Sequence, residues 1–317
     1  MSLAILFSPQ GSQAVGMGRE LAERSAAARA VFEEADATLG WAVSEACWTG
    51  PEDRLNDTRQ TQPCLLTASV AAFRALGERV ELRPELVAGH SVGEYAALVA
   101  SGVLDLATAL RLVSRRAALM ADADGDGGMA AVLGLDRAAV QDVVDGVGRP
   151  TELVVANDNA PGQVVISGRL DCLAAVEEPM RAAGARRVVR LAVSGAFHSP
   201  LMAGVAEELA DAFERERWRD ATVPILSNVT AEPLVDAGRI RALLAEQVRS
   251  PVEWVRCVER MVAEGIDVAV ECGPGSALSG MVKRIAPHVR TANVGDIAGL
   301  ETAVAVVEGV AIAPASV

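Results

Sequence analysis

The amino-acid sequence predicts an α/β protein in which a short parallel sheet, covered by helices, is accompanied by a smaller inserted subdomain. Short apolar runs alternate with longer segments whose apolar residues recur at helical spacing. The chain has 317 residues, of which 51% are apolar and 22% charged, so it can bury a large core. A stretch rich in glycine and aspartate at residues 123–128 separates two parts with different orders of elements.

The first part of the chain alternates strands and helices. The apolar run at residues 3–7 is short, has no basic stretch before it and leads directly into Ser8-Pro9. It therefore predicts a buried strand and not a signal peptide. Pro63 favours the first turn of a helix. The expected elements are strands over 3–7 and 86–89 and helices over 17–39, 63–76, 92–99 and 104–121, which together predict a parallel sheet with helices on its faces.

The middle of the chain follows the order β-α-β-β-α-β, which is typical of the ferredoxin-like fold. We expect residues 125–196 to form this subdomain, and residues 1–124 and 197–317 to form a large domain around the parallel sheet. The subdomain is predicted to contain strands over 129–133, 153–156, 163–167 and 187–193 and helices over 137–144 and 170–183. Beyond it, a helix is expected over 200–216 and strands over 223–226, 268–271 and 291–294.

Composition and charge exclude several classes of function. Forty-two acidic residues against 29 basic ones give a net charge of −13, which repels phosphate backbones, so we expect no nucleic-acid partner. No apolar run approaches the roughly 18 residues of a membrane span. Five scattered cysteines and three histidines support neither a disulfide framework nor a metal site, and indicate a reducing, cytoplasmic setting. Nothing in the sequence demands more than a monomer.

The strongest local signal for chemistry is the motif Gly-x-Ser-x-Gly at residues 89–93, with Ser91 at its centre. A predicted strand precedes the motif and a predicted helix follows it, which is the context of a nucleophile elbow. The glycines allow a tight turn, and the backbone N–H of Val92 at the helix N-terminus can point at an oxyanion. A chance glycine-rich turn is the alternative interpretation, and the strand–turn–helix context disfavours it.

A serine nucleophile needs a base, and the chain has three histidines. His90 adjoins Ser91 on a sharp turn, so we expect its ring to point away and to shape the elbow. His198 precedes Ser199-Pro200, a pattern typical of a helix N-cap and first turn, where the macrodipole favours the neutral imidazole of a general base. A structural histidine at the junction of the two parts is the alternative for His198. His288, which follows a proline, is interpreted as structural.

Arg116 is the third candidate, on the helix expected over residues 104–121. The other two arginines of this helix fall on its polar side, but Arg116 lies three residues after Val113 and four before Met120, at the edge of the apolar face. A buried guanidinium is costly unless it meets a carboxylate. Either an internal acidic side chain or an acidic substrate can supply one. Spacing alone favours the internal salt bridge.

Two polar loops give weaker signals. Residues 7–13 follow the first strand and could place a second backbone N–H near Ser91. Residues 157–163 are interpreted as the turn that joins two strands of the subdomain.

Taken together, these segments resemble the malonyl-CoA:acyl-carrier-protein transacylases, the acyltransferases of fatty-acid and polyketide synthesis. Each motif is modest, but their order along nearly the whole chain is highly specific. The matching segments are residues 10–13, 61–63, 89–95, Arg116 with Met120, 157–163, 195–199, 273–275 and 283–284.

The resemblance implies transfer of a malonyl group from malonyl-CoA to the phosphopantetheine thiol of an acyl carrier protein through a malonyl-serine intermediate. It implies that Ser91 is the nucleophile, His198 the general base and Arg116 the clamp on the malonyl carboxylate. Malonyl-CoA and the carrier protein are substrates in this family, so the resemblance implies no cofactor. It also implies that the large domain, residues 1–124 and 197–317, is a hydrolase-like catalytic domain. A plain serine esterase or thioesterase is the alternative, and it would ordinarily carry an acidic residue that orients its histidine.

The resemblance also implies an oxyanion hole formed by the backbone N–H groups of Gln10 and Val92, and a main-chain carbonyl at Gln247 that orients the histidine. The chain departs from the family at Ser8-Pro9, where Pro-Gly is usual. Proline fixes its own φ and restricts Ser8, which leaves the path of this loop open, while Gln10 keeps its N–H.

Two further expectations concern specificity. Phe197, directly before His198, resembles the pattern of malonyl-selective members, because its ring leaves little room at the malonyl α-carbon. Acyl carrier proteins are acidic, and so is this chain, so docking requires a local basic patch. The candidates for that patch are Lys283, Arg284, Arg186 and Arg187.

Overall fold

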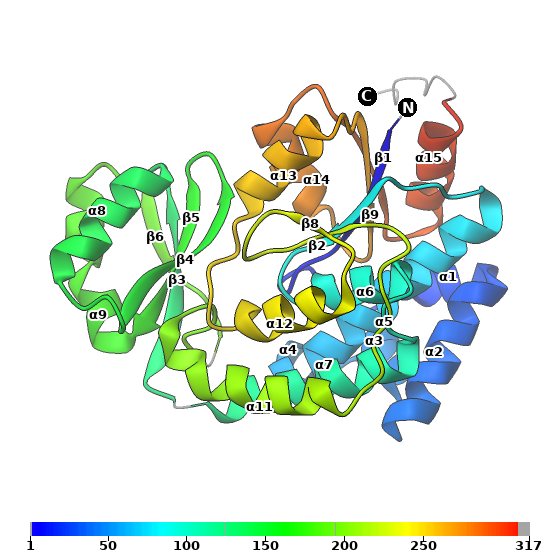
Figure 1. The fold of residues 1–317 in the computed structure, drawn as a ribbon, viewed down its shortest axis with the longest axis horizontal. Coiled ribbons are helices and arrows are strands. Elements are labelled where there is room, and N and C mark those ends of the chain that lie inside the picture. Colours follow the sequence, from blue (N-terminus) through cyan, green and yellow to red (C-terminus); the bar gives the residue numbers. More distant parts are fainter. Residues whose placement is uncertain (1, 124, 194, 310–317) are drawn as a thin grey trace.

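Two sheets organise the computed structural model, which describes residues 2–123, 125–193 and 195–309. Figure 1 shows a large body that contains one sheet and a smaller lobe, on the left, that contains the other. The sheet of the body has the strand order β10-β9-β1-β2-β7-β8, with parallel pairing from β10 to β7 and antiparallel pairing of β7 with β8. Its strands are β1 (Leu3–Phe7), β2 (Leu86–Gly89), β7 (Ile225–Leu226), β8 (Pro233–Leu234), β9 (Val268–Cys272) and β10 (Arg290–Val294).

The central strand β1 shows why the sheet is covered on both faces. All five of its residues are buried, and alternate side chains enter different cores. Leu3, Ile5 and Phe7 pack in the larger core with helices α2, α5, α6, α7 and α15. Ala4 and Leu6 pack against α13 and α14. A strand without polar positions is therefore the signature of a sheet between two helical layers.

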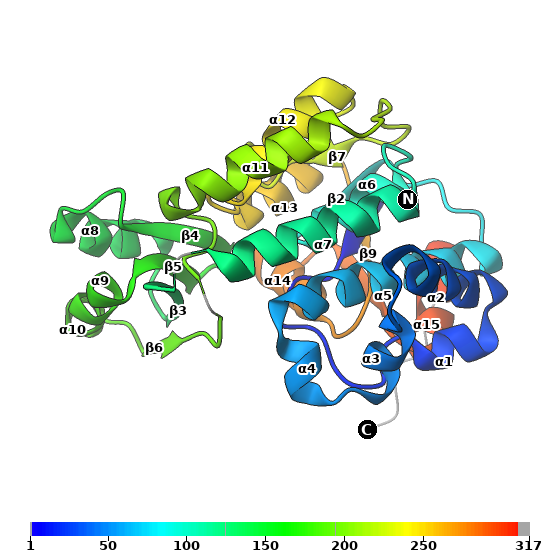
Figure 2. The same ribbon diagram turned by 90° about the horizontal axis from the view of Figure 1, so that it is seen from below.

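Helices form these two layers and the connections between them, and Figure 2 shows α7 running along the body toward the lobe. The helices before the lobe are α1 (Arg19–Arg24), α2 (Ala26–Leu39), α3 (Val43–Thr49), α4 (Glu52–Asn56), α5 (Thr58–Arg79), α6 (Gly93–Ala100) and α7 (Leu106–Asp122). Those after it are a 3₁₀ turn (Pro200–Met202), α11 (Ala203–Glu214), α12 (Ala237–Gln247), α13 (Trp254–Ala263), α14 (Ala277–Ile285) and α15 (Ile297–Val307).

The smaller lobe is an antiparallel sheet of four strands in the order β4-β5-β3-β6, with helices packed on one side. This order places the first and third strands of the lobe at its centre, as in the ferredoxin-like fold. The predicted boundaries at residues 125 and 196 stay predictions, and residue 124 of the predicted hinge lies outside the described residues. The elements are β3 (Gly127–Leu133), α8 (Arg137–Val147), β4 (Leu153–Ala160), β5 (Gln163–Arg169), α9 (Leu170–Ala175), α10 (Glu177–Ala182) and β6 (Arg187–Arg190).

Strand β4 ties the lobe to the body. The N–H of Asp158 donates to the carbonyl of Val252 at 3.0 Å, and the N–H of Val252 donates to the carbonyl of Ala156 at 2.8 Å. Arg137 on α8 forms an ion pair with Glu253, whose side chain is largely buried. Backbone pairing and a partly buried ion pair are stiff connections, so the two parts hold a defined relative position.

The predicted α/β fold class is confirmed, with the strand over residues 86–89 at the expected bounds. Two predicted helices are each divided. The helix over 17–39 breaks at Ser25, whose extended backbone lets its hydroxyl accept the N–H of Ala28 at 2.9 Å. The helix over 170–183 breaks at Val176, and Pro179 in the first turn of α10 lacks the N–H that a continuous helix would need.

Other boundaries also differ from the prediction. Pro63 lies inside α5 and not in its first turn, because Asp57 caps the helix by accepting the N–H of Arg59 at 2.9 Å. The segment over 157–163 is mostly strand, since β4 continues to Ala160 and only two residues turn. The predicted strand over 187–193 ends at residue 190, and the helix over 200–216 begins with a 3₁₀ turn.

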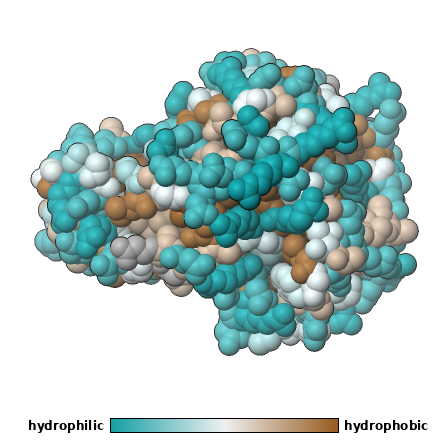
Figure 3. All heavy atoms as spheres, turned by 60° about the horizontal axis from the view of Figure 1, so that its bottom comes forward, coloured by the Kyte–Doolittle hydropathy of each residue, from teal (hydrophilic) through white to brown (hydrophobic). Residues whose placement is uncertain are grey.

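Figure 3 shows one face of the molecule, on which hydrophilic residues predominate and small apolar areas lie near the junction of lobe and body. Among the described residues, no helix has both the length and the apolar character that crossing a bilayer requires.

Candidate active site

Ser91 stands at a sharp turn between β2 and α6, with a left-handed φ of 53°. Two glycines make this turn possible. A Cβ at Gly89 would lie 2.0 Å from the carbonyl carbon of Gly93, and a Cβ at Gly93 would lie 2.3 Å from the carbonyl oxygen of Phe7. The left-handed region is strained for a residue with a side chain and is characteristic of functional sites. The predicted nucleophile elbow is therefore present in the structure.

Asn228 holds the elbow from the neighbouring strand. Its Oδ1 accepts the N–H of Ser91 at 2.6 Å, and its Nδ2 donates to the carbonyl of Gly89 at 2.7 Å. This fully buried residue was not predicted as part of the site. It lies two residues after β7, the strand that pairs with β2, so the polar pair Ser227-Asn228 after the strand predicted over 223–226 was the available signal.

His198 lies beside the nucleophile although 107 positions separate the two residues. Its Nε2 is 2.8 Å from Oγ of Ser91, and its Nδ1 is 2.8 Å from the backbone carbonyl of Gln247. A carbonyl only accepts, so Nδ1 carries the proton and Nε2 is free to accept the serine hydroxyl proton. The backbone N–H of His198 also donates to the carbonyl of Val248 at 2.8 Å. Two carbonyls at the C-terminal end of α12 thus hold His198, that of Gln247 through the imidazole and that of Val248 through the backbone.

Burial, together with the positive charge of Arg116, lowers the pKa of His198 to about 3. The neutral imidazole expected from the sequence therefore has a different cause from the predicted one, because only a three-residue 3₁₀ turn follows His198. The C-terminal carbonyls of α12 act in the opposite sense: they carry partial negative charge and stabilise the imidazolium once a proton is taken up.

Arg116 is almost fully buried on α7 and points at the nucleophile. Its Nη2 donates to Oγ of Ser91 at 3.0 Å and to Oε1 of Gln247 at 3.1 Å, while Nη1 donates to Oε1 of Gln62 at 2.6 Å. Its Nε is buried without a hydrogen-bond partner among the described residues. Burial lowers the pKa of Arg116, and no acidic side chain in the described ranges lies within salt-bridge distance of it.

The salt bridge that spacing alone favoured for Arg116 is therefore wrong. Neutral amide and hydroxyl oxygens solvate the guanidinium, which leaves its charge available to an anionic ligand. From the sequence, Gln62 is known only as part of a segment that matches the family. Its contact with Arg116 depends on the packing of α5 against α7. Sequence spacing along one helix cannot reveal a partner that another helix supplies.

The two candidate oxyanion donors are the backbone N–H groups of Gln10 and Val92. In the described part of the chain, the backbone N–H groups of Gln10 and Val92 form no hydrogen bond, whereas the N–H of Ser91 is occupied by Asn228. Gln10 follows β1 and Val92 precedes α6, and β1 and β2 are paired in parallel. Parallel pairing brings both loops to the same edge of the sheet. Free N–H donors beside the elbow are what a developing oxyanion requires.

A cavity of about 280 Å³ opens over Ser91 and His198, between the body and the lobe. Arg116 and Gln247 lie behind Ser91 and not on the cavity wall, but Arg116 is one hydrogen bond from Oγ. A short acyl chain carried on Oγ therefore starts within reach of the guanidinium. Phe197 and Met120 form part of an apolar wall. The remaining lining comes from residues 9–12, β3, β4, β5 and α14, with His90, Leu191 and Val193.

His90 faces away from the nucleophile, as expected. Its Nε2 is 2.8 Å from Oδ1 of Asn159 on β4, and its ring packs against Trp254 with 5.5 Å between centroids. Burial lowers the pKa of His90 to about 4, so the ring is neutral. This contact joins the elbow to the lobe and gives Asn159 a structural reason to lie in a matching motif.

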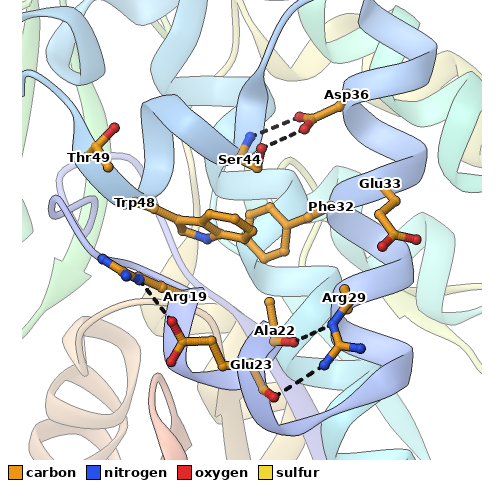
Figure 4. A pocket seen from close by; sticks show the side chains of 10 residues that line it. All are labelled: Arg19, Ala22, Glu23, Arg29, Phe32, Glu33, Asp36, Ser44, Trp48 and Thr49. Carbon is orange, nitrogen blue, oxygen red and sulfur yellow. Dashed lines mark hydrogen bonds and ion pairs between the residues drawn. The ribbon is translucent and has the colours of Figure 1, made fainter.

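A larger cavity, of about 680 Å³, lies on the opposite part of the body among α1, α2 and α3. Figure 4 shows its floor, where Phe32 and Trp48 lie against one another, and its polar rim, where Ser44 meets Asp36. The Ser44 hydroxyl is bonded to a carboxylate, and no histidine lies among the lining residues. Volume alone would select this cavity, but it lacks a nucleophile–base pair.

Metal-ligating side chains do not gather in the described residues: no group of three or more His, Cys, Asp or Glu could hold an ion there. The five cysteines, all within the described residues, are buried and free in the structure.

The His198 geometry makes a prediction about its ionisation. We expect the His198 imidazole to stay neutral, with Nδ1 protonated, from about pH 8 down to about pH 5, because its pKa is about 3. Histidine-selective ¹⁵N NMR, with His198→Ala to assign the signals, measures this directly. A titration midpoint between about 6 and 7 for His198 would contradict the buried, carbonyl-held arrangement.

Comparison with known proteins places this geometry in a family. A family model described as an acyl transferase domain matches residues 5–303. The malonyl CoA-acyl carrier protein transacylase of Bacillus subtilis is 41% identical over 305 residues, which cover 95% of this chain and 96% of the relative. That of Escherichia coli K12 is 40% identical over 284 residues, which cover 89% of this chain and 92% of the relative.

Solved structures agree with the sequence comparison. An acyl-carrier-protein S-malonyltransferase from Burkholderia pseudomallei superposes with a TM-score of 0.93 at 38% identity, covering 96% of this chain and 99% of that one. A malonyl-transacylase in complex with its type II PKS acyl-carrier protein gives the same TM-score, identity and coverage. Similarity that runs from the first strand to the last helix, over nearly the full length of each relative, shows that this chain belongs to the acyl transferase family.

Proposed function

We propose that the protein transfers a malonyl group from malonyl-CoA to the phosphopantetheine thiol of an acyl carrier protein, in fatty-acid or polyketide synthesis, through an ester on Ser91. The observation that carries this proposal is a buried guanidinium, without an acidic partner among the described residues, one hydrogen bond from the nucleophile. Such a group recognises a substrate with a carboxylate near its reacting carbonyl. The relatives from Bacillus subtilis and Escherichia coli are named for the same substrate and acceptor.

In the first half-reaction, Oγ of Ser91 attacks the thioester carbonyl as Nε2 of His198 takes the hydroxyl proton. The N–H groups of Gln10 and Val92 stabilise the oxyanion, and losing one such donor typically costs about 10²–10³ in rate. The carbon–sulfur bond then breaks, and the imidazolium returns its proton to the CoA thiolate. Arg116 holds the malonyl carboxylate throughout, which orients the carbonyl over the nucleophile.

In the second half-reaction, His198 takes the proton of the carrier thiol, whose sulfur attacks the malonyl-serine ester. The ester carbon–oxygen bond breaks, and Oγ of Ser91 recovers the proton from the imidazolium. A main-chain carbonyl suits this site better than an aspartate as the group that orients His198. It fixes the tautomer without placing a full negative charge next to an anionic substrate.

A serine esterase or thioesterase is the alternative, because it shares the elbow. The structure favours acyl transfer in one respect: the partner of His198 Nδ1 is the Gln247 carbonyl and not a carboxylate.

Intact-mass spectrometry tests the proposed intermediate. Brief mixing with malonyl-CoA should add one malonyl group, about 86 Da, to the wild-type protein and nothing to Ser91→Ala. The adduct should disappear when a phosphopantetheinylated carrier protein is added. Rapid release of free malonate without an adduct, or with no dependence on the carrier, would favour hydrolysis.

A competition assay with malonyl-, methylmalonyl- and acetyl-CoA tests the specificity residues. Arg116→Ala should lower kcat/KM for malonyl-CoA by about 10- to 150-fold, as expected for a lost charge-assisted hydrogen bond, and should reduce discrimination against acetyl-CoA.

The wild-type protein should prefer malonyl- over methylmalonyl-CoA, because Phe197 is buried beside His198 and lines the cavity. Unchanged malonyl transfer in Arg116→Ala, or preference for the branched substrate, would contradict these roles.

We propose that the carrier protein docks on the basic residues around the β4–β5 turn. Arg284 on α14 donates to the carbonyl of Pro161 and, at 2.6 Å, to Oε1 of Gln163 in and beside this turn. Arg186 packs next to Gly134, which itself donates to the carbonyl of Gly162 at 2.9 Å. Exposed Lys283 lies on α14, whose Met281 lines the cavity. Positive charge thus gathers at the rim that an acidic carrier must approach.

Charge reversal tests this docking surface. Lys283→Glu should raise KM for the carrier protein several-fold and leave KM for malonyl-CoA unchanged, with an effect that shrinks at high ionic strength. Lys283 is chosen because Arg284 also holds the turn. Arg83→Glu, at an exposed position remote from α14, is the matched control. Equal carrier KM in both variants would place docking elsewhere.

A further inference from the structure

Glu94 is a buried carboxyl next to the elbow that the proposed reaction does not use. It lies in the first turn of α6 and is only 4% exposed. Its Oε2 accepts Nε2 of Gln247 at 2.6 Å. Burial raises the pKa of Glu94 to about 7, opposed by hydrogen bonds from Gln247 and the backbone of Asn228 and by the charge of Arg116. A carboxyl is costly to bury, so its contacts require an explanation.

The contact of Glu94 fixes which way the amide of Gln247 points. Nε2 of this fully buried amide donates both to Glu94 and, at 3.0 Å, to the carbonyl of Ser91, while Oε1 accepts Nη2 of Arg116. Turning the amide over would place its oxygen against two acceptors and its NH₂ group against the guanidinium. The orientation in which oxygen faces Arg116 is therefore the satisfied one.

Gln247 is also the residue whose backbone carbonyl holds His198. Gln247 thus contacts Arg116 and the carbonyl of Ser91 through its side chain, and His198 through its backbone. Glu94 does not lie within 4.0 Å salt-bridge distance of Arg116, so the amide separates the two charges. A carboxylate in direct contact with Arg116 would occupy the donors that an anionic substrate needs. A carboxyl that contacts Arg116 only through the amide of Gln247 leaves those donors accessible.

We infer that Glu94 is a positioning residue that, through the amide of Gln247, holds Arg116 oriented for the carboxylate of the acyl substrate. The role requires a hydrogen-bond acceptor at the length of a glutamate side chain. It does not require ionisation, because a protonated carboxyl keeps a carbonyl oxygen that accepts. This inference rests on the role of Arg116 in the proposed function.

Two matched variants distinguish the effect of side-chain length at position 94 from the effect of its charge. Glu94→Gln keeps the length and an accepting oxygen but removes the charge, whereas Glu94→Asp keeps the charge and withdraws the acceptor by one methylene. Acylation of Ser91 is measured by intact-mass spectrometry with malonyl-CoA and with acetyl-CoA. The readout is the ratio of the two kcat/KM values, malonyl-CoA over acetyl-CoA. Acetyl-CoA uses the same serine, histidine and oxyanion donors but carries no carboxylate, so a merely structural defect lowers both values together.

We expect Glu94→Asp to lower this ratio by about tenfold or more, and Glu94→Gln to stay within about threefold of the wild type. In a Gln247→Ala background, Glu94→Asp should lower the ratio no further, because its effect passes through the amide. Equal loss in Glu94→Gln and Glu94→Asp, no loss in either, or additive loss in the double variant would overturn the inference. Glu94→Gln is isosteric, so it remains informative even if Glu94→Asp fails to fold.

Arg116→Ala distinguishes failure of this inference from failure of the proposed function. If Arg116→Ala lowers the ratio and Glu94→Asp does not, only the role of Glu94 is wrong. If Arg116→Ala leaves the ratio unchanged, the carboxylate clamp is wrong and the inference about Glu94 falls with it.

Discussion

A buried guanidinium solvated by neutral oxygens is the interaction on which the rest of the site depends. Arg116 contacts the nucleophile and two glutamine oxygens, and in the described ranges it meets no acidic side chain within 4.0 Å. Desolvation of a cation is expensive, and most proteins offset that cost with a direct carboxylate. Here three dipolar acceptors replace it, at the junction of α5, α7 and α12. This uncompensated positive charge is the basis of the proposed selectivity for an acyl group that carries its own negative charge.

The same constraint explains how the base is held. A carboxylate beside His198 would place a full negative charge next to Arg116, whereas the Gln247 carbonyl at the end of α12 holds Nδ1 of the imidazole without a full charge. Ser91 has a left-handed φ of 53° and His198 one of 58°, and such strain persists only where surrounding contacts determine the backbone. Asn228 supplies those contacts at the elbow and α12 supplies them at the base. Ser91 and His198 are thus positioned by two segments that are distant in sequence, Asn228 after β7 and the end of α12.

Local patterns predicted the parts of the structure that depend on short-range chemistry. The strand over 86–89, the elbow at Ser91 and the inward side of Arg116 follow from glycine placement and helical spacing. Groups that act across elements were not predictable from spacing alone. Asn228 reaches the elbow because β7 pairs with β2, and Gln62 reaches Arg116 because α5 packs against α7. The wrong salt bridge has the same origin, since helix periodicity identifies a buried face but not what lies opposite.

A crystal structure with a malonyl group trapped on Ser91 would show whether Arg116 binds the carboxylate of the acyl group. We expect a carboxylate oxygen of the malonyl group to lie about 3 Å from a nitrogen of Arg116, with the carbonyl oxygen facing the N–H groups of Gln10 and Val92. A malonyl carboxylate that points into solvent, or that binds another side chain while Arg116 keeps all its present contacts, would contradict this expectation.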